Sequence, residues 1–89
     1  MKPYASETFS ASLQGYAVEC TTVGDAMAVL RADAVLRDKE VCAPIELDRL
    51  AAVVARYGYP RFAETLSGRA VRLRAAEFLL NVTGHEIPK

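Results

Sequence analysis

Apolar and polar residues alternate between residues 7 and 21, on both sides of the dipeptide Gln14-Gly15. Such alternation is typical of strands with one buried side, and a Gly-containing dipeptide between two of them indicates a hairpin. The pattern therefore predicts a β-hairpin whose buried side carries Phe9, Ala11, Leu13, Tyr16, Val18 and Cys20. Several of these positions also share a helical face, but the Ser, Thr and Gly content favours the hairpin.

After Thr22 the apolar residues follow a helical period, which predicts a helix over about residues 23–39. Thr22 suits the N-cap and Asp25 the first turn, where the helix dipole favours an acid. Apolar residues form two stripes on this helix, one with Ala28, Val29, Ala32, Val35 and Leu36, the other with Met27, Leu30 and Ala34. A surface helix needs only one stripe, so the second indicates a central helix or one that faces a partner.

Pro44 fits the start of the next helix, predicted over about 45–57 and plainly amphipathic. Gly58 suits the left-handed position after a helix end, with Tyr59-Pro60 as a stop. A short helix over about 61–66 then leads to Ser67-Gly68. A last helix follows over about 69–82, ending at Gly84 and leaving a polar tail over residues 84–89.

These elements predict an α+β, predominantly helical fold in which the N-terminal hairpin packs on three main helices and a short fourth. An all-α fold is the alternative, if residues 7–21 are helical. No linker, repeat or low-complexity tract interrupts the 89 residues, so we expect a single domain over residues 1–89. A chain this short buries only about 60–65% of its unfolded surface, so its stability should be marginal without a partner or a second copy.

The last predicted helix is apolar on two sides. One stripe contains Val71, Ala75, Phe78, Leu79 and Val82, and the other Leu73, Ala76 and Leu80. Few other elements are available to cover both stripes, and large uncovered apolar patches are unusual on monomers. We therefore expect a homodimer formed through this helix.

Nothing in the chain indicates catalysis. The only histidine, His85, falls in the polar tail, and neither Cys20 nor Cys42 has a predicted activating group or a metal-ligand spacing. The five glycines are scattered singly, so no phosphate-binding loop is present. We expect no catalytic residue, no metal and no cofactor, and hence a non-enzymatic protein.

Composition narrows the class of protein further. A net charge of zero with 52% hydrophobic and 25% charged residues excludes a disordered or strongly basic chain. No stretch reaches the roughly 20 apolar residues of a membrane span, and Met1-Lys2-Pro3-Tyr4 does not lead into a secretory signal. We expect a cytoplasmic protein without membrane contact. The excess of Arg over Lys and the abundant Ala suggest a bacterial or phage genome.

The strongest local feature is the corner over residues 56–62, which combines Arg56, Tyr57, Tyr59, Arg61 and Phe62. Tyr and Arg dominate binding hot spots because they offer large contact area and directional hydrogen bonds. The same residues also suit a purely structural role, with Tyr57 on an apolar helix face and Tyr59 beside a glycine cap. The function that these features favour is a regulator, inhibitor or adaptor that binds another protein through this corner.

Charge is unevenly distributed along the chain. Residues 1–48 have a balance of −4, whereas residues 49–74 contain six arginines and one acid, a balance of +5. This asymmetry makes a nucleic-acid-binding regulator the alternative, with contacts from Arg49, Arg56, Arg61, Arg69 and Arg72. It also suits self-association, or a pairing of the two halves inside the fold. The last helix is a poor major-groove reader, because its widest faces are apolar.

Overall fold

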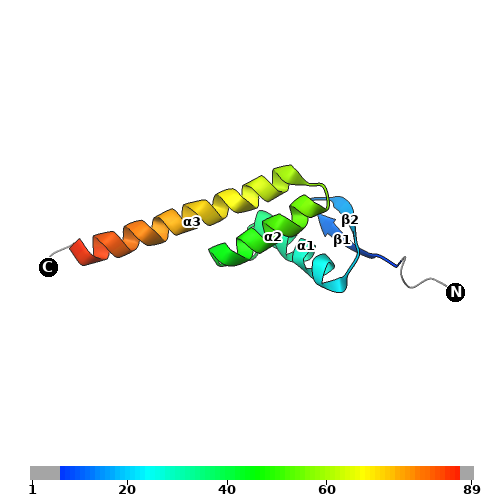
Figure 1. Cartoon of the computed structure of the whole chain (residues 1–89), viewed down its shortest axis with the longest axis horizontal. Helices are drawn as coiled ribbons and strands as arrows, with labels where there is room; N and C mark the ends of the chain where they lie inside the picture. The colour runs from blue at the N-terminus through cyan, green and yellow to red at the C-terminus, as the bar shows by residue number, and fades with distance from the viewer. Residues whose placement is uncertain (1–6, 87–89) are drawn as a thin grey trace.

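The computed structural model describes residues 7–86, with side chains described as far as Leu80. Two strands precede three helices: β1 (Phe9–Leu13), β2 (Tyr16–Cys20), α1 (Val23–Leu36), α2 (Pro44–Arg56) and α3 (Pro60–Glu86). The hairpin packs on α1, α1 packs on α2, and α3 runs along α2 and then continues past it (Figure 1). The predicted α+β, predominantly helical class is confirmed.

The two strands form an antiparallel hairpin, as the alternation predicts. Gln14 and Gly15 both have positive φ, 51° and 90°, which is the type I′ geometry that matches the twist of paired strands. Alternate side chains face α1, and four of the six predicted inward residues are fully buried: Ala11, Leu13, Val18 and Cys20. Phe9 and Tyr16, at opposite ends of the buried side, remain exposed.

Helix α1 begins as predicted, because the Thr22 hydroxyl accepts a hydrogen bond of 3.0 Å from the Asp25 backbone N–H. It ends at Leu36, three residues before the predicted end at Lys39. The reason is Asp38, whose φ of 62° turns the chain out of the helix. The Lys39 N–H then donates to the Ala34 carbonyl, which is the closing bond of a Schellman motif.

Helix α2 lies within one residue of its predicted bounds and ends in the same motif. Gly58 has a φ of 98°, the left-handed conformation that its position after the helix predicts. The Tyr59 N–H donates to the Val54 carbonyl over 3.1 Å. Pro60 then opens α3, so the corner between the two helices is only three residues long.

The prediction of two separate helices, 61–66 and 69–82, is wrong. A single helix, α3, runs through Ser67-Gly68 and past Gly84 to Glu86, so residues 84–86 of the predicted tail are helical and 87–89 lie outside the described residues. Gly in a helix costs about 1 kcal/mol relative to Ala. Leu66 and Ala70, on either side of the dipeptide, are both fully buried, and that burial offsets the cost.

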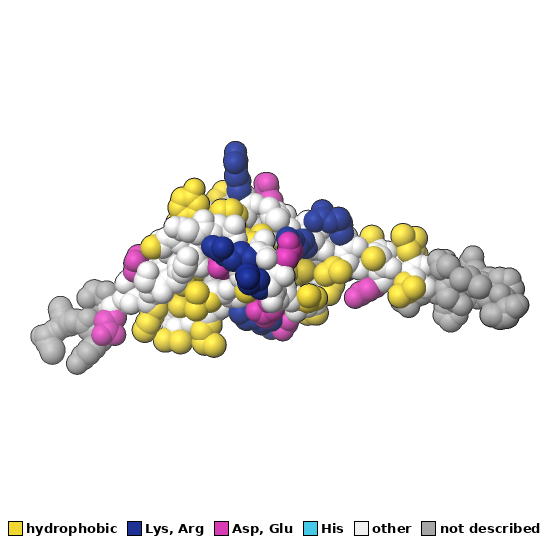
Figure 2. Space-filling view, turned by 180° about the vertical axis from the view of Figure 1, so that it is seen from behind, with side chains coloured by type: hydrophobic (Ala, Val, Ile, Leu, Met, Phe, Trp, Pro, Cys, Tyr) yellow, Lys and Arg dark blue, Asp and Glu magenta, His cyan; other side chains and the backbone are white. Residues whose placement is uncertain are grey.

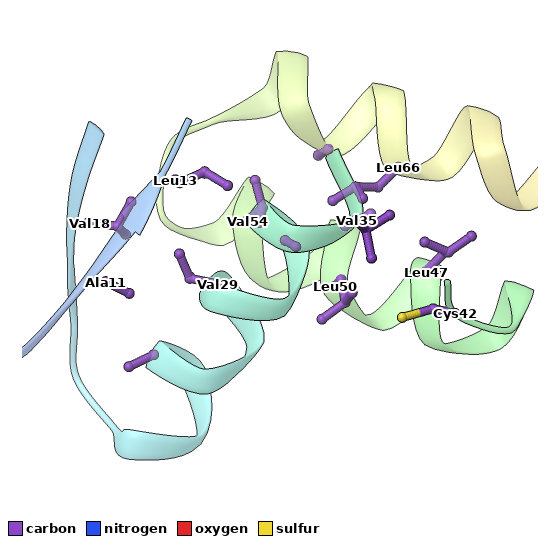
Figure 3. Packing of buried hydrophobic residues seen from close by; sticks show 14 of the residues in the cluster. Ala11, Leu13, Val18, Val29, Val35, Cys42, Leu47, Leu50, Val54 and Leu66 are labelled. Carbon is purple, nitrogen blue, oxygen red and sulfur yellow. The ribbon is translucent and has the colours of Figure 1, made fainter. Parts of the chain in front are cut away.

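The core lies where the hairpin, α1, α2 and the first third of α3 meet. Figure 3 shows labelled side chains of the hairpin, α1, α2 and α3, among them Leu13, Val29 and Leu66, gathered in the space between these elements. Within the described residues, no polar or charged residue is buried. The core is therefore apolar throughout, and α3 contributes to it only as far as Ala70.

Candidate protein-binding surfaces

The structure divides the five corner residues into two groups that face different parts of the molecule. Arg56 and Tyr57 turn toward α1. The Tyr57 hydroxyl donates a hydrogen bond of 2.6 Å to Asp25 and accepts one of 2.9 Å from the Thr21 N–H. Arg56 forms an ion pair of 3.1 Å with Asp25 and lies over the Tyr57 ring. These two residues join α2 to the start of α1, so the structure gives them a structural role.

This contact also changes the acidity of Asp25. The hydrogen bond from Tyr57 is the main cause that lowers the pKa of Asp25, and Arg56 and the Thr22 hydroxyl lower it further. Partial desolvation opposes the shift without reversing it. Asp25 is therefore held as a carboxylate at the helix N-terminus, where the dipole also favours negative charge.

The other three corner residues form an exposed surface with Tyr16 of the hairpin. The Tyr16 ring centroid lies 5.7 Å from that of Tyr59 and 6.1 Å from that of Phe62, and Tyr59 stacks on Phe62 at 6.1 Å. These distances are typical of favourable aromatic pairs. Together with Gly58, Pro60 and Arg61, the rings line an open hollow of about 370 Å³. We call Tyr16, Tyr59, Arg61 and Phe62 the aromatic surface.

Tyr16 is the member of the aromatic surface that the sequence did not indicate. Alternation assigned it to the buried side of the hairpin, yet its side chain is 57% exposed because it lies beside the turn, at the end of that side. Among the described residues, Arg61 is the only charged one that lines the hollow. It has no ion pair or side-chain hydrogen bond within the described part of the chain. The surface is therefore aromatic with a single free positive charge.

Three of the six arginines in the arginine-rich segment pair with the acidic half of the chain. Arg56 pairs with Asp25, Arg69 with Asp38 over 3.0 Å, and Arg74 with Asp48 over 2.8 Å. Arg69 also donates a hydrogen bond of 2.8 Å to the Val35 carbonyl at the end of α1. Half of the six arginines in 49–74 thus neutralise acids of residues 1–48 inside the fold.

Arg49, Arg61 and Arg72 have no ion pair among the described residues, and they line three separate hollows. Arg49 lies in the hollow between α1 and α2, beside Met27 and Val53, whereas Arg72 lies on α3. Figure 2 shows basic side chains interspersed with acidic and apolar ones on the face that it presents. The predicted nucleic-acid residues are therefore not gathered into one basic patch.

The second half of α3 extends away from the rest of the molecule (Figure 1). Every side chain from residue 71 to residue 80 is exposed, including large apolar ones: Val71 63%, Phe78 66%, Leu79 61% and Leu80 72%. Figure 2 shows apolar side chains along the described part of the extended helix. The described members of both predicted stripes, which are all of them except Val82, are thus uncovered in a single chain.

The two cysteines are separate, buried and reduced. Burial raises the pKa of the Cys20 thiol, and Asp25 and Glu19 add to the shift. Burial is also the main cause that raises the pKa of Cys42, although Arg31 opposes it. Among the residues whose side chains the structure describes, 7–80, no group of His, Cys, Asp and Glu is placed to hold a metal ion. No helix in the described part of the chain is long and apolar enough to cross a membrane.

Comparison of the chain with protein-family models, with curated proteins and with solved structures finds no match. The chemistry of its surfaces is therefore the basis for assigning a function.

Proposed function

We propose that this protein is a small non-enzymatic regulator, inhibitor or adaptor that binds another protein through the aromatic surface and associates with itself through α3. The observation that carries the proposal is the clustering of three aromatic rings around a hollow that Arg61 also lines, with no other charged residue of the described chain. Exposed Tyr and Arg are the residues enriched in binding hot spots.

The partner that fits this surface is a protein segment with a large apolar side chain next to a carboxylate. The apolar side chain would lie against the rings of Tyr16, Tyr59 and Phe62. The carboxylate would pair with Arg61, whose guanidinium can donate hydrogen bonds to both carboxylate oxygens at once. Tyr59 and Phe62 are half-buried and pack against the core, which already restricts the rotation of their side chains. Binding would therefore cost these two residues little side-chain entropy.

Selection of a random peptide library on the purified protein tests this surface. We expect enriched peptides to contain Asp or Glu beside an aromatic or large aliphatic residue. Arg61→Ala and Tyr59→Ala should weaken binding of the selected peptides by about 1–4 kcal/mol, which corresponds to roughly 5- to 900-fold. Arg72→Ala is the matched control, because it removes another unpaired arginine from a distant part of α3. Equal binding by all these variants would refute the proposal.

Self-association through α3 is tested by sedimentation at micromolar concentration. The wild-type chain should sediment as a dimer, whereas Phe78→Glu should be monomeric because it places a charge in the apolar stripe. Thr65→Glu introduces the same charge on the same helix outside the stripe and should remain dimeric. A wild-type monomer, or identical behaviour of the two variants, would exclude this dimer.

A nucleic-acid-binding regulator remains the alternative function. Arg49, Arg61 and Arg72 are the arginines free for phosphate contacts, and they line separate hollows. Such binding predicts an affinity that falls steeply with salt. A mobility shift with duplex or single-stranded DNA or RNA at low salt, lost on raising the salt, would favour it over the protein-binding function.

A further inference from the structure

The extended half of α3 carries a narrow apolar seam at coiled-coil spacing. Val71, Ala75 and Phe78 follow one another at intervals of four and three residues, and the sequence continues the interval to Val82. In heptad terms, Val71 and Phe78 occupy d positions and Ala75 an a position. The three described seam residues are exposed, so the seam is available to another helix. We call Val71, Ala75 and Phe78 the α3 seam.

The sizes of the seam residues favour one orientation of two such helices. In a parallel pair, each a or d residue faces its own copy, so Ala75 would meet Ala75 and Phe78 would meet Phe78. One layer would then be underfilled and the next crowded, and both defects are costly in a close-packed interface. In an antiparallel pair, a positions face d positions, so each Ala75 accommodates the Phe78 ring of the other chain.

The helix dipoles and Arg72 favour the same orientation. Arg69 and Arg74 already pair with Asp38 and Asp48, so Arg72 is the arginine of this part of α3 that has no ion pair among the described residues. A parallel pair aligns the two helix dipoles and places the two Arg72 residues at the same level. An antiparallel pair opposes the dipoles and separates the two Arg72 residues by about 13 Å along the axis.

We infer that the α3 seam is covered by the α3 seam of a second copy running antiparallel, with the two-fold axis near residues 76 and 77. This inference rests on the self-association proposed above. In this register Val71 lies opposite Val82 and Ala75 lies opposite Phe78. Helical rise then places the two α2–α3 corners about 50 Å apart, at opposite ends of the dimer.

The orientation has a functional consequence. In the antiparallel dimer the two aromatic surfaces lie about 50 Å apart and cannot combine into one site. The dimer therefore offers two independent binding sites for the apolar and acidic partner segment proposed above. A partner that carries two copies of this segment would be held at both ends, which raises its apparent affinity without any new contact. A parallel pair would instead bring both corners to the same end of the dimer.

Spin labels on α3 test the orientation directly. Glu64 is exposed on the part of α3 that flanks the core, and Glu64→Cys introduces a labelling site there. In the antiparallel dimer the two labels should lie about 35–40 Å apart, since about 25 residues of helix separate them. Glu77→Cys is the matched control, because a label beside the two-fold axis should give a distance under about 20 Å in either orientation. The unsubstituted chain, carried through the same labelling, measures background from the buried Cys20 and Cys42.

Each outcome has a distinct meaning. A distance of 35–40 Å at residue 64 with a short distance at residue 77 supports the antiparallel pair. Short distances at both positions overturn it and leave a parallel dimer, in which the proposed self-association still stands. The absence of any intermolecular distance at both positions, together with monomeric sedimentation, refutes self-association itself. A long distance at residue 77 refutes pairing through the α3 seam.

Discussion

The Tyr57 hydroxyl lies 2.6 Å from Oδ2 of Asp25, and this hydrogen bond joins the end of α2 to the first turn of α1. It is the main cause of the lowered pKa of Asp25. Because the folded state favours the carboxylate, Asp25 stabilises the fold above its ordinary pKa of about 3.9. That contribution is lost as the pH falls through the lowered pKa of the folded state.

We therefore expect Tyr57→Phe to lower stability at neutral pH and to shift acid unfolding to a higher pH. Circular dichroism as a function of pH measures both effects. The difference between wild type and Tyr57→Phe should be largest above pH 5 and should shrink as Asp25 becomes protonated. Asp25→Asn should be less stable than wild type at neutral pH and should flatten this part of the pH dependence. Identical acid transitions in wild type and Tyr57→Phe would contradict the assignment.

Gly68 is a site where substitution should stabilise the protein. It lies within α3, and a Cβ there would come no closer than 3.7 Å to the end of the flexible Arg72 side chain. Gly68→Ala should raise the free energy of unfolding by about 0.5–1 kcal/mol, because Ala loses less conformational entropy in a helix. Gly58→Ala should do the opposite, since φ at Gly58 is 98°. Thermal denaturation of both variants measures the contrast, and a destabilised Gly68→Ala would argue against a continuous α3.

Arg69 should matter more to the fold than its acidic partner does. It donates hydrogen bonds to the Val35 carbonyl and to Asp38, and the carbonyl belongs to the last turn of α1. Arg69→Ala should cost about 1–2 kcal/mol because it removes both bonds. Asp38→Asn breaks only an exposed ion pair and should cost less than about 1 kcal/mol. Urea denaturation compares the two, and equal losses would show that the contact with Val35 contributes nothing.

The thiols of Cys20 and Cys42 should be unreactive in the folded protein. Both are buried, and burial raises the pKa of each thiol, so little thiolate is present near neutral pH. With a chromogenic disulfide at pH 8, we expect slow reaction of the native chain and rapid reaction of both thiols in denaturant. Fast reaction of one thiol without denaturant would show that its part of the fold opens readily.

The predicted local features follow from local chemistry. The Thr22 cap, the left-handed Gly58 and four of the six inward residues of the hairpin are confirmed, because each depends on a few neighbouring residues. The end of α1 was misplaced because the left-handed conformation falls on Asp38, which gives a weaker signal than glycine would. The corner was identified as one cluster, yet the fold turns Tyr57 inward and adds Tyr16 from a strand more than 40 residues away.

The sequence by itself determined the hydrophobic periodicity of the strands and helices, the turns at Gln14-Gly15 and Gly58, and the uneven distribution of charge along the chain. Only the tertiary structure decided that α3 is continuous, because packing of Leu66 and Ala70 on either side of Ser67-Gly68 outweighs the weak helix propensity of that dipeptide. It also decided that Arg56, Arg69 and Arg74 pair with acids of the first half. Pairing across the fold depends on which helices lie side by side, and hydrophobic burial sets that arrangement, not the order of charges along the chain.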